Sequence, residues 1–261
     1  MRRFNWSWLV ATAFAAFGST VPLAAQIDYR NLDGHRPTRV TDAYPIERYA
    51  FELTLPYGFS RASGVSTHTV SPHLEYGIGR NLMVGFGAEI ADRAAETTLG
   101  VGGLWNVRRE TPSWPGFGLS FEVTQPLDGA RFGADASVAL GALATRSVGR
   151  SRLHLNAAAA VLRPDAAARW TEPAWWAGLA WDYTLFRTST LLVADLFAED
   201  HGGGEEVDWV AGFGARRQLT PTLVIHGGIE RSLRSGRSAT EINLGLSHAF
   251  AVRALMRGGR Q

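Results

Sequence analysis

The feature that most constrains the fold is a strict alternation over residues 49–59. Apolar or aromatic residues occupy every odd position from Tyr49 to Phe59, and small or polar residues occupy every even position. A period of two is typical of a β-strand with one apolar and one polar face. A strand of about 9–11 residues with aromatic residues at both rims matches a transmembrane strand. Strands of soluble β-sandwiches also alternate, but they are usually about 5–6 residues long.

The same alternation recurs in about twelve segments along the rest of the chain. We therefore predict an all-β protein, a transmembrane antiparallel up-and-down β-barrel of about 12 strands, over residues 46–250. The ninth of these segments is the least regular, because Leu191, Val193 and Phe197 share a face with Asp195. Alternation alone does not exclude a soluble sandwich, whereas strand length, aromatic rims and an even strand number together favour the barrel.

The chain begins with a segment typical of a cleaved secretory signal peptide, which we assign to residues 1–25. It has two arginines near its start, an apolar run from Trp6 to Phe17, and small residues at Ala24 and Ala25. With the barrel pattern, this segment predicts the bacterial outer membrane as the location. Outer-membrane lipid and the barrel-assembly machinery are then the expected partners.

Two further segments flank the alternating region. Residues 26–45 are polar and irregular. We expect them to form a solvated periplasmic lead segment, the alternative being a segment that tucks into the lumen. Residues 251–261 follow the aromatic Phe250 of the last predicted strand and form a C-terminal tail of unassigned role.

The composition excludes two simple interpretations. The chain has no cysteine, so disulfides cannot stabilise it and it must rely on its core or on a closed sheet. Its formal net charge is +2, but the strand region alone has 18 basic and 21 acidic residues, a net charge of −3. The positive net charge of the whole chain therefore does not indicate nucleic-acid binding.

Mid-strand charges fall on the polar face of the predicted strands and none falls on the apolar face. A charge facing lipid near the bilayer midplane costs a few kcal/mol, while a charge facing the lumen costs little. We therefore predict that one set of titratable side chains faces the lumen. Its members are Glu52, Glu75, Glu89, Glu122, Asp135, Arg152, His154, Asp182, Asp195 and Glu230.

Two interiors are compatible with this set. An open lumen with an excess of acids would mildly favour cations. If Arg48, Arg108, Arg152 and Arg216 instead pair with the acids, the interior is a crosslinked polar core that conducts poorly. Barrels of about eight strands are filled and those of about sixteen hold a water channel, so twelve strands leave both alternatives open.

Strand parity separates the connections into two sets. Short connections are expected on the periplasmic side and longer ones on the outer side. The short ones are residues 79–81, 187–189 and 217–221, and the longer ones are residues 60–66, 91–96, 163–173 and 200–206.

Neither a metal site nor a catalytic site stands out. The acidic stretch from Glu199 to Glu206 could bind a divalent cation or bridge lipopolysaccharide, but it lacks calcium-loop spacing, so a solvated outer loop is expected. A barrel-embedded esterase would need a serine beside a histidine, such as Ser120 or Ser137 with His154. No local motif singles out these residues, so we expect no enzyme, no cofactor and no metal.

The segment from Asp33 to Pro45, the following Ile46–Glu52, and the later Arg217–Leu223 together resemble a known family. These are bacterial outer-membrane barrels of the transporter family described as the "MetA-pathway of phenol degradation". The likeness spans most of the mature chain. It implies uptake of small, often aromatic or hydrophobic, compounds, and it brings no agreed binding or catalytic residues.

From these observations we expect a passive channel or transporter for small solutes. The alternatives are a barrel-embedded enzyme that acts on lipid, and a structural or surface-interaction barrel with a plugged lumen.

Overall fold

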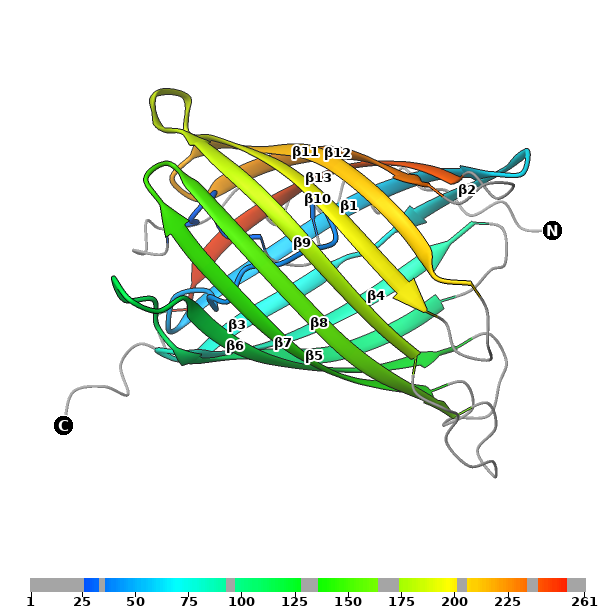
Figure 1. The fold of residues 1–261 in the computed structure, drawn as a ribbon, viewed down its shortest axis with the longest axis horizontal. Helices are drawn as coiled ribbons and strands as arrows, with labels where there is room; N and C mark the ends of the chain where they lie inside the picture. The colour runs from blue at the N-terminus through cyan, green and yellow to red at the C-terminus, as the bar shows by residue number, and fades with distance from the viewer. Residues whose placement is uncertain are drawn as a thin grey trace.

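The chain forms one antiparallel sheet that closes into a barrel (Figure 1). The computed structural model describes residues 26–32, 36–92, 97–127, 136–163, 174–200, 206–233 and 239–252. Apart from β2 and β3, neighbouring strands along the chain pair with one another, and the last strand, β13, pairs along its whole length with β1. The predicted all-β, up-and-down barrel is therefore confirmed. Within the described part of the chain, no helix is long and apolar enough to cross a membrane.

Thirteen strands make up the sheet, and most are 10 to 13 residues long. They are β1 Ala50–Ala62, β2 Val65–Val70, β3 His73–Gly79, β4 Leu82–Ala91, β5 Thr97–Arg108, β6 Gly116–Pro126, β7 Ala136–Val148, β8 Ser151–Arg163, β9 Ala174–Leu185, β10 Thr190–Asp200, β11 Asp208–Thr220, β12 Leu223–Ser232 and β13 Ala239–Ala251.

The thirteen strands fill twelve positions around the barrel, because β2 and β3 lie end to end in one position. Both pair with β1 on one side and with β4 on the other. Pro72 stands between them and has no N–H group to donate to the sheet. The second strand of the sequence pattern is therefore interrupted at Pro72.

One predicted connection is wrong. Residues 60–66 were expected to form a longer outer loop, but β1 continues to Ala62 and β2 begins at Val65. Only Ser63 and Gly64 form the turn, and both have positive φ values, of 50° and 79°. Two residues with positive φ are typical of a tight β-hairpin, whose twist matches that of the flanking strands.

The outer surface of the barrel carries large apolar side chains. Leu140, Leu155 and Leu179, on β7 to β9, are 67%, 56% and 53% exposed. Soluble proteins rarely expose an apolar surface that continues from strand to strand. Such a surface around a closed sheet is the surface of a transmembrane barrel, so the fold is that of a bacterial outer-membrane protein.

The segment before β1 lies inside the barrel, where Figure 1 shows it as a blue trace within the ring of strands. Thr38, Val40 and Ala43 have no exposed surface. We refer to residues 26–32 and 36–49 as the plug. The expected solvated periplasmic lead segment is therefore corrected to the alternative, a segment that tucks into the lumen. The inner wall makes this possible by supplying partners for the polar groups of the plug.

Candidate functional site

Asparagines on the inner wall hold the main chain of the plug. The Asn156 side chain accepts a hydrogen bond from the Thr41 N–H at 2.8 Å and donates one to the Thr41 carbonyl oxygen at 2.9 Å. Asn106 and Asn243 donate to two further carbonyl oxygens of the plug, at 2.6 and 3.0 Å. Buried main-chain groups need such partners, so these side chains replace a pairing strand. The sequence signal was present, as mid-strand asparagines on the polar face, but it did not indicate what they bind.

Arg39 is the main charged contact of the plug with the β10–β12 wall. Its Nε donates to Glu230 at 2.8 Å, its Nη1 donates to Glu199 at 3.1 Å, and its main-chain N–H donates to Asp195 at 3.0 Å. Burial acts to lower the pKa of Arg39, but Glu230 and Glu199 outweigh it and raise the pKa above its ordinary value. The Arg39 guanidinium therefore stays charged. Glu199, predicted in a solvated loop, is instead a plug contact, and residues 201–205 lie outside the described part.

Arg152 joins the plug to the adjoining part of the wall, formed by β8 and β9. It forms ion pairs with Asp42 of the plug at 3.0 Å and with Asp182 of β9 at 2.7 Å, and it also donates to the Arg30 carbonyl oxygen. Both carboxylates are fully buried. A buried carboxylate needs a paired and hydrogen-bonded cation to offset its desolvation, and Arg152 serves two of them.

His154 is part of the same network. Its Nε2 bonds to Asp182 at 3.0 Å and its Nδ1 to the Thr145 hydroxyl at 3.0 Å. The Thr145 oxygen also accepts the Ala43 N–H of the plug, and all three wall residues are buried. Both ring nitrogens are thus engaged, and neither Ser120 nor Ser137 bonds to His154. The array joins the wall to the plug.

The inner face of β10 is apolar where it meets the plug. Leu191, Val193 and Phe197 pack with Leu32 and Val40 of the plug in one buried cluster. This contact explains why the sequence pattern of this strand is irregular: its inner face is buried against a segment of the chain instead of facing water.

Several cavities remain among the described residues, and two of them extend into the barrel beside the plug. The larger, of about 430 Å³, lies mainly against β3 to β7 and is lined by Asp42 on the plug side. The smaller, of about 380 Å³, is lined by Glu52, Arg152 and residues at the start of the plug. Because Asp42 lines one cavity and Arg152 the other, their ion pair lies between the two.

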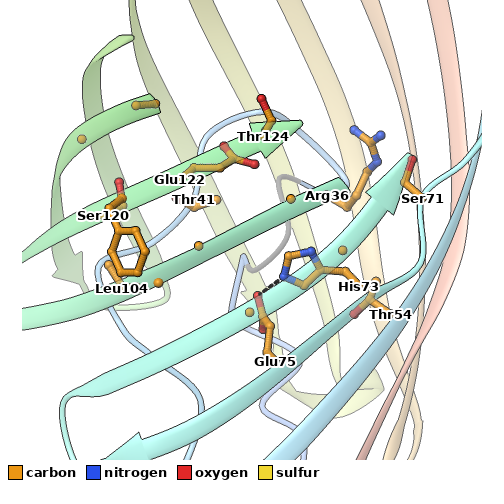
Figure 2. Close-up of a pocket in the computed structure, with 18 of the residues that line it drawn as sticks. Arg36, Thr41, Thr54, Ser71, His73, Glu75, Leu104, Ser120, Glu122 and Thr124 are labelled. Carbon is orange, nitrogen blue, oxygen red and sulfur yellow. Dashed lines mark ion pairs between the residues drawn. The ribbon is translucent and has the colours of Figure 1, made fainter. Parts of the chain in front are cut away.

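The structure describes nine of the ten side chains predicted to face the lumen, and Asp135 lies outside the described residues. Three of the nine line the larger cavity: Glu75, Glu89 and Glu122. Figure 2 labels Glu75 and Glu122. The other six take part in ion pairs or hydrogen bonds inside the barrel: Glu52, Arg152, His154, Asp182, Asp195 and Glu230.

The four arginines considered for crosslinking divide into two pairs. Arg152 and Arg216 lie in ion pairs with buried acids, the latter 3.7 Å from Glu52. The guanidinium groups of Arg48 and Arg108 instead lie over aromatic rings, 4.3 and 4.8 Å from the ring centres. The interior is therefore crosslinked in one part. The described residues include no group of three or more His, Asp or Glu that could hold a metal ion.

No family model and no curated protein matches the chain. Among solved structures, the KdgM porin in complex with disordered oligogalacturonate matches 76% of this chain and 99% of its own, with a TM-score of 0.59 and 8% identity. The NanC porin matches 74% of this chain and 98% of its own, with a TM-score of 0.57 and 8% identity. An outer-membrane channel from Pseudomonas putida F1 matches 80% of this chain and 98% of its own, with a TM-score of 0.54 and 16% identity. At these identities the similarity establishes the fold.

Proposed function

We propose that this chain is a passive outer-membrane channel for small solutes, in which the plug controls passage. The observation that carries the proposal is the larger cavity, about 430 Å³ of lumen that the plug leaves unfilled and that carboxylates line. The fold supports the proposal as well, because the structures it resembles are described as porins and channels.

A solute crossing the barrel has to pass from the larger cavity to the smaller one. The Asp42–Arg152 ion pair and the main chain around Thr41 lie between them. Much of what holds this part of the plug is hydrogen bonds and ion pairs, and water can replace such contacts at a modest net cost. Displacement of the plug is therefore the step that would open the channel.

The lumen also bears on the class of solute. Oligogalacturonate, the ligand in the KdgM structure, is a chain of negatively charged sugars. In this barrel, Glu75, Glu89 and Glu122 line the larger cavity and would repel such a chain, so a mild preference for cations is proposed. The resemblance to the phenol-degradation transporters suggests small aromatic or hydrophobic solutes, and Trp176 in the same wall suits them.

A removable crosslink would test this function. Thr41 and Asn156 contact each other through side-chain atoms 3.2 Å apart, and the natural chain has no cysteine, so the double variant Thr41→Cys/Asn156→Cys would contain the only thiols. In planar bilayers we expect cation-selective current steps from the natural and reduced proteins. Oxidation of the double variant should strongly reduce this current, while each single-cysteine variant should be insensitive to oxidation.

Other outcomes would change the proposal. Equal current from the oxidised and reduced double variant would mean that solutes pass without movement of the plug. No current from any folded and inserted form would contradict the channel. It would favour the second candidate, a structural or surface-interaction barrel, which the contacts of the plug with the wall also support.

A further inference from the structure

Inside the barrel, the acidic side chains form ion pairs with arginines on one side of the lumen only. Several buried acids meet an arginine, in the pairs Asp182–Arg152, Glu230–Arg39 and Glu52–Arg216. In the larger cavity, none of Glu75, Glu89 and Glu122 forms an ion pair with an arginine within the described residues. Of the described residues that line this cavity, four are acids and one is an arginine, Arg36, which lies 3.9 Å from Glu241, so carboxyl groups outnumber arginines there.

Glu75 is the buried member of this group. It is 4% exposed, and its Oε1 lies 3.5 Å from Nε2 of His73, as the dashed line in Figure 2 shows. Its Oε2 is buried and has no hydrogen-bond partner. A buried carboxylate oxygen without a partner is costly, so a donor entering the cavity would supply a contact that the protein itself lacks.

Glycines form the floor of the cavity between Glu75 and Glu122. Glu75 pairs across the sheet with Gly85, Gly85 with Gly102, and Gly102 with Glu122. With about 4.8 Å between neighbouring strands, the main chains of the two glutamates are roughly 14 Å apart, with only glycines between them. Glycines in strand interiors often mark a place where a ligand comes close to the main chain.

Gly85, with Gly87 and Gly100 of the next cross-strand row, shows which part of this floor is open. Cβ atoms added at Gly85 and Gly87 would lie 2.5 and 2.7 Å from ring nitrogens of His73, so the imidazole covers β4. A Cβ atom added at Gly100 would meet nothing closer than Oε1 of Glu122, at 3.7 Å. The space over β5 therefore lies open between His73 and Glu122.

The same cavity has an apolar part. Met83, Leu104 and Leu143 line it from β4, β5 and β7, and Trp176 lines it from β9. A ligand that fits has an apolar body for these side chains and a positively charged head for the glutamates.

From these observations we infer that the larger cavity binds small organic cations, and that Glu75 receives the ammonium or guanidinium group. The inference rests on the proposed function, because it names the solute class of the same lumen. Unlike the proposed function, the inference requires only that the cation binds in the cavity, so it can be tested without measuring transport.

Titration calorimetry on the folded barrel in detergent would test it with three probes that share one ring. Benzylammonium has a cationic head, benzyl alcohol a neutral head and benzoate an anionic head. We expect saturable binding of benzylammonium, with affinity at least tenfold above that of the other two. Glu75→Gln should lower the affinity for benzylammonium at least tenfold. Glu47→Gln, which removes the same charge from an exposed residue outside this cavity, should leave it unchanged.

A second variant tests the cavity while leaving Glu75 unchanged. Gly100→Leu places a side chain in the open part of the floor without a main-chain clash, and it should abolish binding in a protein that still shows the heat-modifiable band of a folded barrel. Equal affinity for benzoate and benzylammonium, or full binding by either variant, would overturn the inference. Absence of current in bilayers together with the expected binding would contradict only the channel.

Discussion

At the scale of single residues, the wall of the barrel recognises the main chain of the plug through side-chain amides. Asn156 is the clearest case because it satisfies both the N–H and the carbonyl of Thr41, and it has no exposed surface. An amide can donate and accept at once, which no carboxylate or arginine can do. Position 156 therefore serves the plug differently from the charged residues around it.

The substitution Asn156→Leu should destabilise the protein by about 1–3 kcal/mol, because it leaves two polar groups of Thr41 without partners. Urea unfolding in detergent, followed by tryptophan fluorescence, would measure the change in the free energy of unfolding. Asn81→Leu, in the exposed turn between β3 and β4, should change it by no more than about 0.5 kcal/mol. Equal effects of the two substitutions would show that the contact with Thr41 contributes nothing.

At the scale of elements, each strand has an outer face set by lipid and an inner face set by what lies in the lumen. Outside, the alternation of apolar residues is regular because hydrocarbon accepts no charge. Inside, water, ion pairs and the plug each favour different side chains. The irregular pattern of β10 is the result, since Leu191, Val193 and Phe197 pack on the plug while Asp195 accepts a hydrogen bond from it.

Two neighbouring positions on β7 test this assignment of faces. Leu140 is 67% exposed on the outer surface, whereas Ala139 lines the larger cavity opposite Glu122. Leu140→Arg should cost about 2–4 kcal/mol because it places a charge in lipid, and it should reduce the yield of assembled barrel. Ala139→Arg should assemble normally.

The heat-modifiable band on electrophoresis measures assembly of both variants after refolding into lipid vesicles. Loss of assembly in Ala139→Arg with normal assembly of Leu140→Arg would reverse the two faces.

At the scale of the whole molecule, the ring of strands closes without help from the plug. The pairing of β1 with β13 runs from Ala50 opposite Ala251 to Ala62 opposite Ala239, and the plug takes no part in it. The plug adds contacts within the ring, which itself forms one continuous sheet. The two parts of the molecule should therefore be separable.

Deletion of residues 26–45 should yield a barrel that still inserts into a bilayer. Its conductance should rise several-fold, because the segment between the two cavities is gone. Its unfolding midpoint in urea should fall, because the contacts of Arg39, Asp42 and Val40 with the wall are lost. Unchanged conductance of the deleted form would mean that the plug does not limit passage, and failure to fold would show that the ring depends on it.

The ring of strands and the side of the sheet that faces lipid could both be predicted from the order of residues along the chain. Both follow from local rules, because neighbouring side chains on a strand point to opposite faces and the bilayer excludes charge from one of them. What fills the lumen could not be predicted in this way and became visible in the folded barrel. Arg39 meets Glu230 across 191 positions of the chain, and Glu75 meets no arginine within the described residues. No period in the sequence encodes such pairings, because they depend on which segments closure of the barrel brings together and on where the plug lies.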